Sequence, residues 1–339
     1  MTEERIIRYS EAQNEAIRHE MQEDPTVFIM GEDIAGAAGR MHLGLVDAWG
    51  GPFRTTRGLI GEFGPERVLD TPVSESGFVG TAVGAATVGM RPIVELMFID
   101  FLGVCFDQFL SNASKLRYML GGQVEVPLTV ITRTGAGVGS AAQHSESLYS
   151  VLVHIPGIKV IAPSDPYTAK GLLAAAIRDN DPVVVCDHKK LMNNTGHVPE
   201  ESYTLPLGKA RVLRQGRDVT LIGISLMTLV CMEAAEKLAE EGIDAEVIDL
   251  LSLSPLDDET ILESVSKTNR IVIVDEDNPR CGMAADIAAM VASRAFDYLD
   301  APPQMVTAPH TPVPYSRNLE DLYVPNAARV VAAAKQTLS

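Results

Sequence analysis

The chain has 339 residues, 46% of them hydrophobic and 22% charged, as expected for a globular protein with enough apolar residues for two cores. Its formal net charge of −17 disfavours nucleic acid and anionic membrane surfaces as partners. The sequence shows no run of about 18 apolar residues, no signal-peptide pattern and no CxxC pair among its four cysteines, so a reduced cytoplasmic protein is expected.

Apolar strands alternate with helices in the first half of the chain. Strands are predicted at 27–30, 92–98, 126–132, 158–163 and 183–187. Helices are predicted at 11–22, from Glu75 onward, at about 101–119 and from 164 to about 178, with a surface loop at 36–58. Because the strands are almost continuously apolar, we expect a parallel sheet that helices cover on both faces.

The second half repeats this alternation after an interruption. Residues 189–208 are rich in Asn, Gly and Pro and are predicted to form a linker. Further strands are predicted at 218–225, 243–250, 270–276 and 304–309, and helices at about 227–241, 257–266, 283–297 and from 320. The pattern predicts two α/β domains, 1–188 and 209–339, each a three-layer arrangement with a sheet between helices.

A carboxylate opens a helix that is unusually rich in glycine. Glu75 is followed by Gly77, Gly80, Gly84 and Gly89, although each interior glycine costs a helix about 1 kcal/mol relative to alanine. Residues 77, 80 and 84 share one face, which would let another backbone approach closely. Glu75 is either an acid placed favourably in a first turn or a buried carboxylate that exchanges a proton with a cofactor or substrate.

A histidine lies in a run of small residues directly after a predicted strand. His144 belongs to GAGVGSAAQHSES, and ligands of open parallel sheets bind beyond the carboxyl ends of the strands. A histidine here can exchange a proton near pH 7, although a loop residue without a role is an equal alternative. The glycines at 135, 137 and 139 do not form G-x-G-x-x-G, so a dinucleotide site has little support.

Two further features are less informative. Met97 and Phe101 flank the end of a predicted strand and could face a ring, but packing in the core is the simpler interpretation. The acidic run at 275–277 ends another predicted strand, and it favours a solvated loop over a metal site.

Five motifs occur in an order that is typical of one enzyme family. They are DTPVSESG (70–77), VELMFIDF (94–101), AAQHSES (141–147), HIPGIKVIAPSDPYTAKGLL (154–173) and AIRDNDPV (176–183). Through them the chain resembles the β subunits of thiamine-diphosphate-dependent 2-oxo acid dehydrogenases. The resemblance implies a transketolase-like pyrimidine-binding domain followed by a domain like the transketolase C-terminal domain. The segments most similar to the acetoin dehydrogenase members are 31–40, 47–53 and 115–130.

The resemblance implies roles for four residues named above. Glu75 falls on the acid that contacts the aminopyrimidine ring of thiamine diphosphate and favours the imino tautomer, whose nitrogen removes the thiazolium C2 proton. His144 falls on a histidine that assists proton transfer or acyl transfer to lipoamide. Phe101 falls on an aromatic position beside the pyrimidine, with Met97 nearby. A potassium ion in some relatives is held by a loop that matches Leu128, Ala176, Ile177, Asp179 and Asp181.

A missing signature implies a partner. Members of this family hold the diphosphate and its Mg²⁺ with a Gly-Asp-Gly motif and a later asparagine, and no Gly-Asp-Gly occurs in this chain. The resemblance therefore implies a separate α subunit for Mg²⁺ and the diphosphate, two α plus two β chains, and a lipoyl-bearing acyltransferase core. Acetoin cleavage is the leading expectation. Decarboxylation of pyruvate or a branched-chain 2-oxo acid, and a non-catalytic assembly role, are the alternatives.

Overall fold

The structure is a computed structural model that describes residues 5–35 and 50–339. The predicted surface loop at 36–58 and the segments 31–40 and 47–53 therefore lie partly outside the described residues. By their internal contacts, the residues divide into two units. Unit 1 comprises the chain up to 133 with 151–187 and 191–207, and unit 2 comprises 134–150, 188–190 and 208–339.

The two units and the two predicted domains share one boundary, at the carboxyl end of the predicted linker. Their other boundaries differ. Both separate the chain near residues 207 and 208. The prediction places 134–150 in the first domain, whereas the contacts of this segment assign it to unit 2. Residues 191–207, predicted to be linker, belong to unit 1 and contain a strand.

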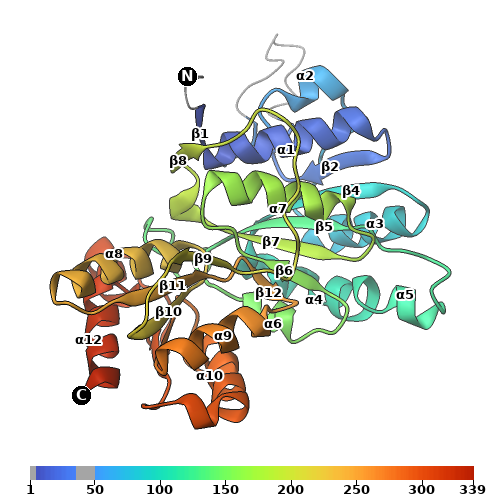
Figure 1. Cartoon of the computed structure of the whole chain (residues 1–339). Helices are drawn as coiled ribbons and strands as arrows, with labels where there is room; N and C mark the ends of the chain where they lie inside the picture. The colour runs from blue at the N-terminus through green and yellow to red at the C-terminus, as the bar shows by residue number, and fades with distance from the viewer. Residues whose placement is uncertain (1–4, 36–49) are drawn as a thin grey trace. The chain divides into compact units, whose positions relative to one another are not determined.

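Unit 1 is built on a sheet with the strand order β6-β7-β5-β4-β2-β3 (Figure 1). The pairs β2–β3, β2–β4, β4–β5 and β6–β7 are parallel, as expected for strands rich in Val and Ile. The strands are β2 (Val27–Gly31), β3 (Val68–Asp70), β4 (Arg91–Phe98), β5 (Thr129–Thr134), β6 (Lys159–Ile161) and β7 (Val183–His188). The predicted parallel α/β fold is confirmed.

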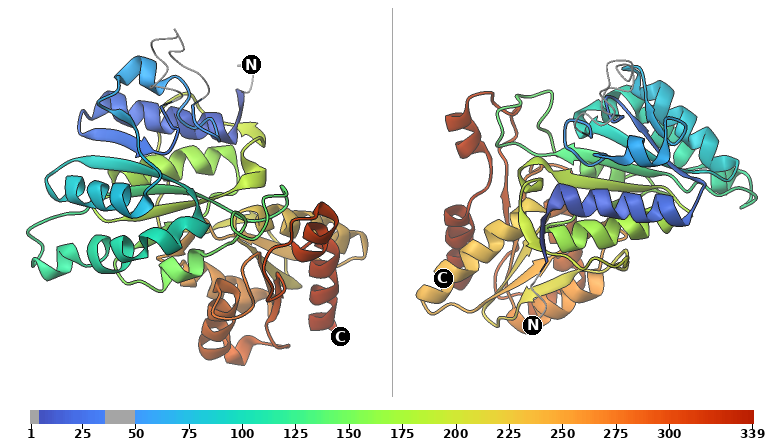
Figure 2. Two further views of the ribbon diagram at one scale, coloured as in Figure 1. Left: turned by 180° about the vertical axis from the view of Figure 1, so that it is seen from behind. Right: turned by 90° about the horizontal axis from the view of Figure 1, so that it is seen from above.

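Helices cover this sheet in two groups. The helices α1 (Tyr9–Glu23) and α7 (Pro166–Arg178) lie side by side, while α3 (Glu75–Thr87) packs against α4 (Leu102–Asp107), as Figures 1 and 2 show. The start of α7 is well defined because the Asp165 carboxylate accepts a hydrogen bond from the Thr168 N–H at 2.7 Å, and Pro166 occupies the first turn.

The prediction of a single helix at about 101–119 is wrong in detail. A 3₁₀ turn (Ile99–Phe101) precedes α4, a π-helical segment follows at Gln108–Ala113, and the short α5 ends the region at Leu116–Met119. The remaining short helices are α2 (Leu59–Phe63) and α6 (Tyr149–Val153). Departures of this kind from α-helical geometry are common near functional sites.

A buried ion pair fixes the end of β7 inside unit 1. Asp187 and Arg133 are both fully buried, and an Arg133 Nη1–Asp187 Oδ2 distance of 2.5 Å joins them. The Asp187 carboxylate also accepts hydrogen bonds from the Tyr9 hydroxyl and from Gln13 Nε2, the latter at 2.7 Å. Helix α1 is thereby attached to the sheet by polar contacts as well as by its apolar face.

Unit 2 contains a second sheet, with the strand order β14-β13-β10-β11-β9. Its strands are β9 (Arg211–Arg214), β10 (Val219–Gly223), β11 (Ala245–Asp249), β13 (Ile271–Asp275) and β14 (Gln304–Thr307). The pairs β10–β11, β10–β13 and β13–β14 are parallel, whereas β9–β11 is antiparallel and makes this sheet mixed. Two helical layers enclose it, as predicted (Figure 1). They consist of α8 (Leu226–Glu240) with α12 (Ala327–Leu338), and of α9 (Asp258–Thr268) with α10 (Met283–Arg294).

Several short elements escaped prediction, including β3, β9, α2 and α6. Strand β1 (Ile6–Arg8) pairs antiparallel with β8 (Thr195–His197), which lies inside the predicted linker. A short strand β12 covers Ser252–Ser254, and Phe296–Tyr298 forms a 3₁₀ turn. The predicted final helix is two helices, α11 (Arg317–Tyr323) and α12, because Pro325 interrupts the helical hydrogen bonds between them. No helix in the described part of the chain is long and apolar enough to span a membrane.

Candidate functional site

Glu75 is a buried carboxylate at the start of a helix. It is the first residue of α3, directly after β3, and only 6% of it is exposed. None of the described residues, 5–35 and 50–339, donates a hydrogen bond to its side chain. The partial positive charge of the helix N-terminus favours an ionised acid here, but it supplies no direct partner. A buried carboxylate of this kind suits a ligand that brings its own donor.

A second acid, Glu32, lies near Glu75. It follows β2 directly and is 9% exposed, and its Oε1 atom is buried without a hydrogen-bond partner among the described residues. Burial and the negative charge of Glu75 raise the pKa of the Glu32 carboxyl. The same two causes raise the pKa of the buried Cys105 thiol to about 12. Glu32 was not predicted as a site residue, because 43 positions separate it from Glu75 in the sequence.

Aromatic side chains lie at the same edge of the unit 1 sheet. Phe98 ends β4, and its ring packs edge-to-face against Phe101, with 5.8 Å between centroids, and against Phe53, with 5.7 Å. Phe101 and Met97 are both only partly buried. They are therefore not simply core residues, and their exposed surface could contact a bound ring.

These groups meet because β2, β3 and β4 run in parallel. Their carboxyl ends lie at one edge of the sheet, which is where α/β proteins bind ligands. Glu32 comes from the end of β2, Glu75 follows β3, and Phe101 follows β4. Two acids, one with a raised pKa, beside aromatic rings can hold a flat, nitrogen-containing ring by hydrogen bonds and stacking.

His144 belongs to the other unit. Its loop lies between β5 and α6, and residues 134–150 pack within unit 2. The side chain is partly buried, and the His144 N–H donates to the Ala141 carbonyl at 3.4 Å. Lys189 Nζ donates to the His144 carbonyl and, at 3.2 Å, to Ser145 Oγ. The His144 backbone is thus fixed by a buried lysine that no sequence motif marks as a site residue.

The acidic run at 275–277 is buried, so the predicted solvated loop is wrong. Asp275 is fully buried, and its carboxylate accepts hydrogen bonds from the Tyr149 hydroxyl and from two backbone N–H groups. Burial and the charge of Asp275 raise the pKa of Asp277 to about 7. No group of three or more His, Cys, Asp or Glu residues within 5–35 and 50–339 could hold a metal ion.

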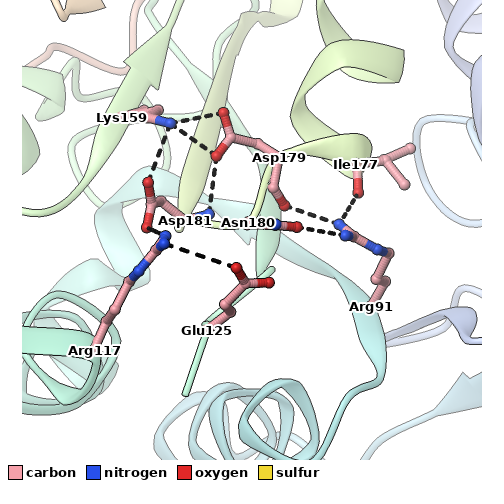
Figure 3. A network of polar contacts seen from close by, with 8 residues as sticks. All are labelled: Arg91, Arg117, Glu125, Lys159, Ile177, Asp179, Asn180 and Asp181. Carbon is pink, nitrogen blue, oxygen red and sulfur yellow. Dashed lines mark hydrogen bonds and ion pairs between the residues drawn. The ribbon is translucent and has the colours of Figure 1, made fainter. Parts of the chain in front are cut away.

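The residues predicted for potassium already have protein partners (Figure 3). Arg91 Nη1 donates to the carbonyl oxygens of Ile177 and Asp179 at 3.1 and 2.9 Å. The Leu128 carbonyl accepts from the Val183 N–H at 2.9 Å. The Ala176 carbonyl accepts from the Asp179 N–H at 3.2 Å.

The carboxylates of this loop are neutralised as well. Lys159 Nζ lies 2.7 Å from Asp179 Oδ2 and 3.4 Å from Asp181 Oδ2, and Arg117 Nη1 lies 2.6 Å from Asp181 Oδ1 (Figure 3). Burial opposes ionisation of Asp181, but Arg117 and Lys159 outweigh it and lower the pKa of this carboxyl. Three basic side chains therefore contact the Ile177 and Asp179 carbonyls and the Asp179 and Asp181 carboxylates in the absence of a bound cation.

We expect the loop to be stable without potassium. Exchanging K⁺ for Na⁺ at constant ionic strength should change the thermal midpoint by less than about 1 °C, because three basic side chains already hold these oxygens. Thermal unfolding of the purified chain in the two salts measures this. Saturating, K⁺-specific binding would instead add about 2–3 kcal/mol at a hundredfold excess over Kd, and a rise of several degrees in K⁺ alone would contradict our expectation.

Similarity to known proteins defines the class of the chain. Residues 6–195 match the family "Transketolase, pyrimidine binding domain", and residues 208–330 match "Transketolase, C-terminal domain". A solved split-gene transketolase, an inactive β4 tetramer, has the same fold, with a TM-score of 0.77, 24% identity and 98% of both chains covered. The chain belongs to the transketolase-like family, in the branch that contains dehydrogenase β subunits.

Individual relatives in that branch are similar over nearly their whole length. The chain is 53% identical over 334 residues to the β subunit of acetoin:2,6-dichlorophenolindophenol oxidoreductase from Bacillus subtilis, covering 98% of both chains. It is 55% identical over 325 residues to the corresponding subunit from Cupriavidus necator, covering 96% and 95%. It is 42% identical over 330 residues to the pyruvate dehydrogenase E1 β subunit of Rickettsia felis, covering 97% and 98%.

Proposed function

We propose that this chain is the β subunit of a thiamine-diphosphate-dependent enzyme that cleaves acetoin and passes the acyl group to a lipoyl-bearing acyltransferase core. The observation that supports acetoin is the identity of 53% and 55% to two acetoin oxidoreductase β subunits, against 42% to a pyruvate dehydrogenase β subunit. Pyruvate or branched-chain 2-oxo acid decarboxylation is the second candidate. The edge of unit 1 that holds Glu75 supports a catalytic role over one in assembly alone.

The described residues fit the pyrimidine end of the cofactor. A buried carboxylate without a donor, a nearby acid with a raised pKa and partly exposed aromatic rings suit a flat ring that carries hydrogen-bond donors. Glu75 would hold a proton between its carboxylate and a ring nitrogen, while Phe101 and Met97 would orient the ring. When bound, thiamine diphosphate supplies the carbanion chemistry of the reaction, and the protein supplies binding and proton control.

We propose that an α subunit completes the site. It would hold Mg²⁺ and the diphosphate, and two α plus two β chains would form the working enzyme. The glycine face of α3 supports this arrangement in part. Among residues 5–35 and 50–339, no heavy atom would lie within 4 Å of a Cβ atom at Gly84, so the described structure leaves this position open to a neighbour. Gly80, in contrast, is occupied within the chain, because its Cβ would lie 2.9 Å from Gln108 Oε1.

Reconstitution with the α subunit tests the proposed reaction. The enzyme, with thiamine diphosphate and Mg²⁺, is assayed by dye reduction with acetoin, pyruvate and 3-methyl-2-oxobutanoate in parallel. We expect the highest kcat/KM for acetoin. A higher value for either 2-oxo acid would assign the chain to the second candidate, and no turnover of any of the three by an assembled complex would contradict both.

A leucine at position 84 is expected to prevent assembly while preserving the fold. Gly84→Leu removes a helix-destabilising residue, so the purified chain should unfold at the same temperature or higher. The larger side chain should block the close approach of a partner helix and lower the affinity for the α subunit at least about tenfold, as measured by analytical ultracentrifugation.

Gly61→Leu is the matched control. Gly61 is an exposed helical glycine of α2, and a Cβ added there would meet no heavy atom of the described residues within 4 Å, so the same substitution should leave assembly unchanged. Normal assembly of Gly84→Leu with the α subunit would show that the open face of α3 is not the interface.

A further inference from the structure

The glycine run before His144 forms a backbone cradle. Gly135, Gly137 and Gly139 all have positive φ angles, of 86°, 94° and 75°. Left-handed residues at alternate positions turn successive N–H groups toward one side, and such concave backbone segments bind anions. A phosphate would be a common occupant of a cradle of this kind. Here the occupants are two carboxylates of the same chain.

Glu320 occupies one part of the cradle with both of its oxygens. The Gly137 N–H donates to Oε1 at 3.0 Å, and the Gly139 N–H donates to Oε2 at 2.8 Å. Glu320 lies in α11 and is only 1% exposed. Hydrogen bonds to an ionised, buried carboxylate are stronger than those between neutral groups, so this two-point attachment fixes the loop well.

Glu276 holds the neighbouring N–H group. Its Oε1 atom accepts from the Ala136 N–H at 2.5 Å, and its Oε2 atom lies 2.8 Å from His188 Nε2. Burial opposes ionisation of Glu276, but the charge and hydrogen bond of His188 outweigh it and lower the pKa of this carboxyl. The imidazole also fills the space beside Gly135, where a Cβ would lie 2.0 Å from Nε2, so only glycine fits there.

Apolar packing supports the same attachment. Ala136 is fully buried in a cluster with Ala308, Val313 and Tyr323, which all belong to unit 2. Tyr323 follows Glu320 by one helical turn, so α11 supplies both an apolar and a charged contact to the loop. At the other end of the segment, Lys189 holds the His144 carbonyl.

We propose that Glu320 and Glu276 are positioning residues for His144. Their carboxylates replace an external anion in the cradle and fix the backbone on which His144 is carried, so that the imidazole is held ready to transfer a proton. This inference rests on the proposed function, because it assigns the loop a purpose in catalysis. The Ala136, Gly137 and Gly139 N–H groups, which a phosphate would otherwise need, already donate to these two carboxylates.

Hydrogen exchange in the reconstituted holoenzyme tests the attachment directly. Glu320→Ala should make the amides in a peptide covering 135–148 exchange roughly 10–100 times faster, because two hydrogen bonds to a buried charge are lost. The central strands of unit 2 should exchange as before. Asp321→Ala, which removes an exposed carboxylate from the same helix, is the control and should have no effect. Unchanged exchange in Glu320→Ala would overturn the proposal.

Kinetics then separate positioning from a purely structural role. Glu320→Ala should lower kcat about 10–100-fold with little change in KM, and Glu320→Gln, which retains one acceptor oxygen, should recover part of the loss. In combination with His144→Ala, Glu320→Ala should cost little more than His144→Ala alone, because both act through the same imidazole. Fully additive losses would overturn the proposal.

The results for His144→Ala and Glu320→Ala distinguish the proposed function from the positioning role. If His144→Ala retains wild-type turnover, the proposed role of His144 is wrong and the positioning proposal fails with it, although faster exchange in Glu320→Ala would still establish the attachment. If His144→Ala abolishes turnover while Glu320→Ala does not reduce kcat, the proposed function stands and only the positioning role is overturned.

Discussion

Glu75→Gln is expected to lower the turnover of the reconstituted enzyme at least about 100-fold, the range in which general acid–base groups contribute. Glutamine has nearly the same shape, but its amide cannot hold or release the proton that a carboxylate exchanges with a ring nitrogen. The substitution also loses the favourable interaction of a negative charge with the N-terminus of α3, which costs roughly 0.3–1 kcal/mol. That loss is too small to unfold the chain.

Dye-coupled turnover, the thermal midpoint and cofactor affinity together test this prediction. The midpoint of Glu75→Gln should stay within a few degrees of the wild type, so a loss of turnover is not a loss of fold. Glu66→Gln changes an exposed acid in the same region and should leave turnover intact. If Glu75→Gln were as active as the wild type, the assignment of this carboxylate as the proton-exchanging group would be incorrect.

The second large effect concerns stability. Asp187→Ala leaves the Arg133 guanidinium charged and fully buried without its carboxylate, and removing one partner of a buried pair costs about 3–5 kcal/mol. The Tyr9 hydroxyl and the Gln13 amide lose an acceptor at the same time. The thermal midpoint should therefore fall by roughly 6–20 °C.

An exposed ion pair provides the comparison. Lys237 Nζ lies 2.6 Å from Glu233 Oε1 on the surface of α8. Glu233→Ala should lower the free energy of unfolding by less than about 1 kcal/mol. The thermal midpoint of Asp187→Asn should lie between those of the two alanine variants, because asparagine retains an acceptor for Tyr9 and Gln13 but removes the negative charge paired with Arg133. Equal thermal midpoints for Asp187→Ala and Glu233→Ala would mean that water or another side chain replaces Asp187 as the partner of Arg133.

Local patterns identified most of the regular structure. Apolar runs correctly located β2, β4 and β10, and the helix expected from 164 to about 178 corresponds to α7, which begins at Pro166 after the Asp165 cap. The strands β1 and β8 could not be found this way, because each has three residues and they pair across almost the whole of unit 1. The boundary between α11 and α12 depends on Pro325, a helix-breaking residue that is visible in the sequence itself.

The sequence alone predicts only some of the residues of the candidate site. Glu75 was singled out because four glycines follow it, and a local anomaly of this kind can be seen in the residues themselves. Glu32 and Glu320 have ordinary neighbours in the sequence, and only the fold brings them to a second acid or to a glycine cradle. Burial of the acidic run at 275–277 likewise depends on donors such as Tyr149, more than a hundred positions away.

The course of the chain between the units limits how the gene could be divided. The polypeptide changes unit five times, after residues 133, 150, 187, 190 and 207. Wherever a single peptide bond is cut, at least one of the two fragments therefore contains segments of both units. Severing the chain at 207 would separate Glu276 and Glu320 from the N–H groups of Ala136, Gly137 and Gly139, which donate hydrogen bonds to them in the intact chain. We expect such a piece to be insoluble when expressed alone, and to be rescued by co-expression of residues 1–207.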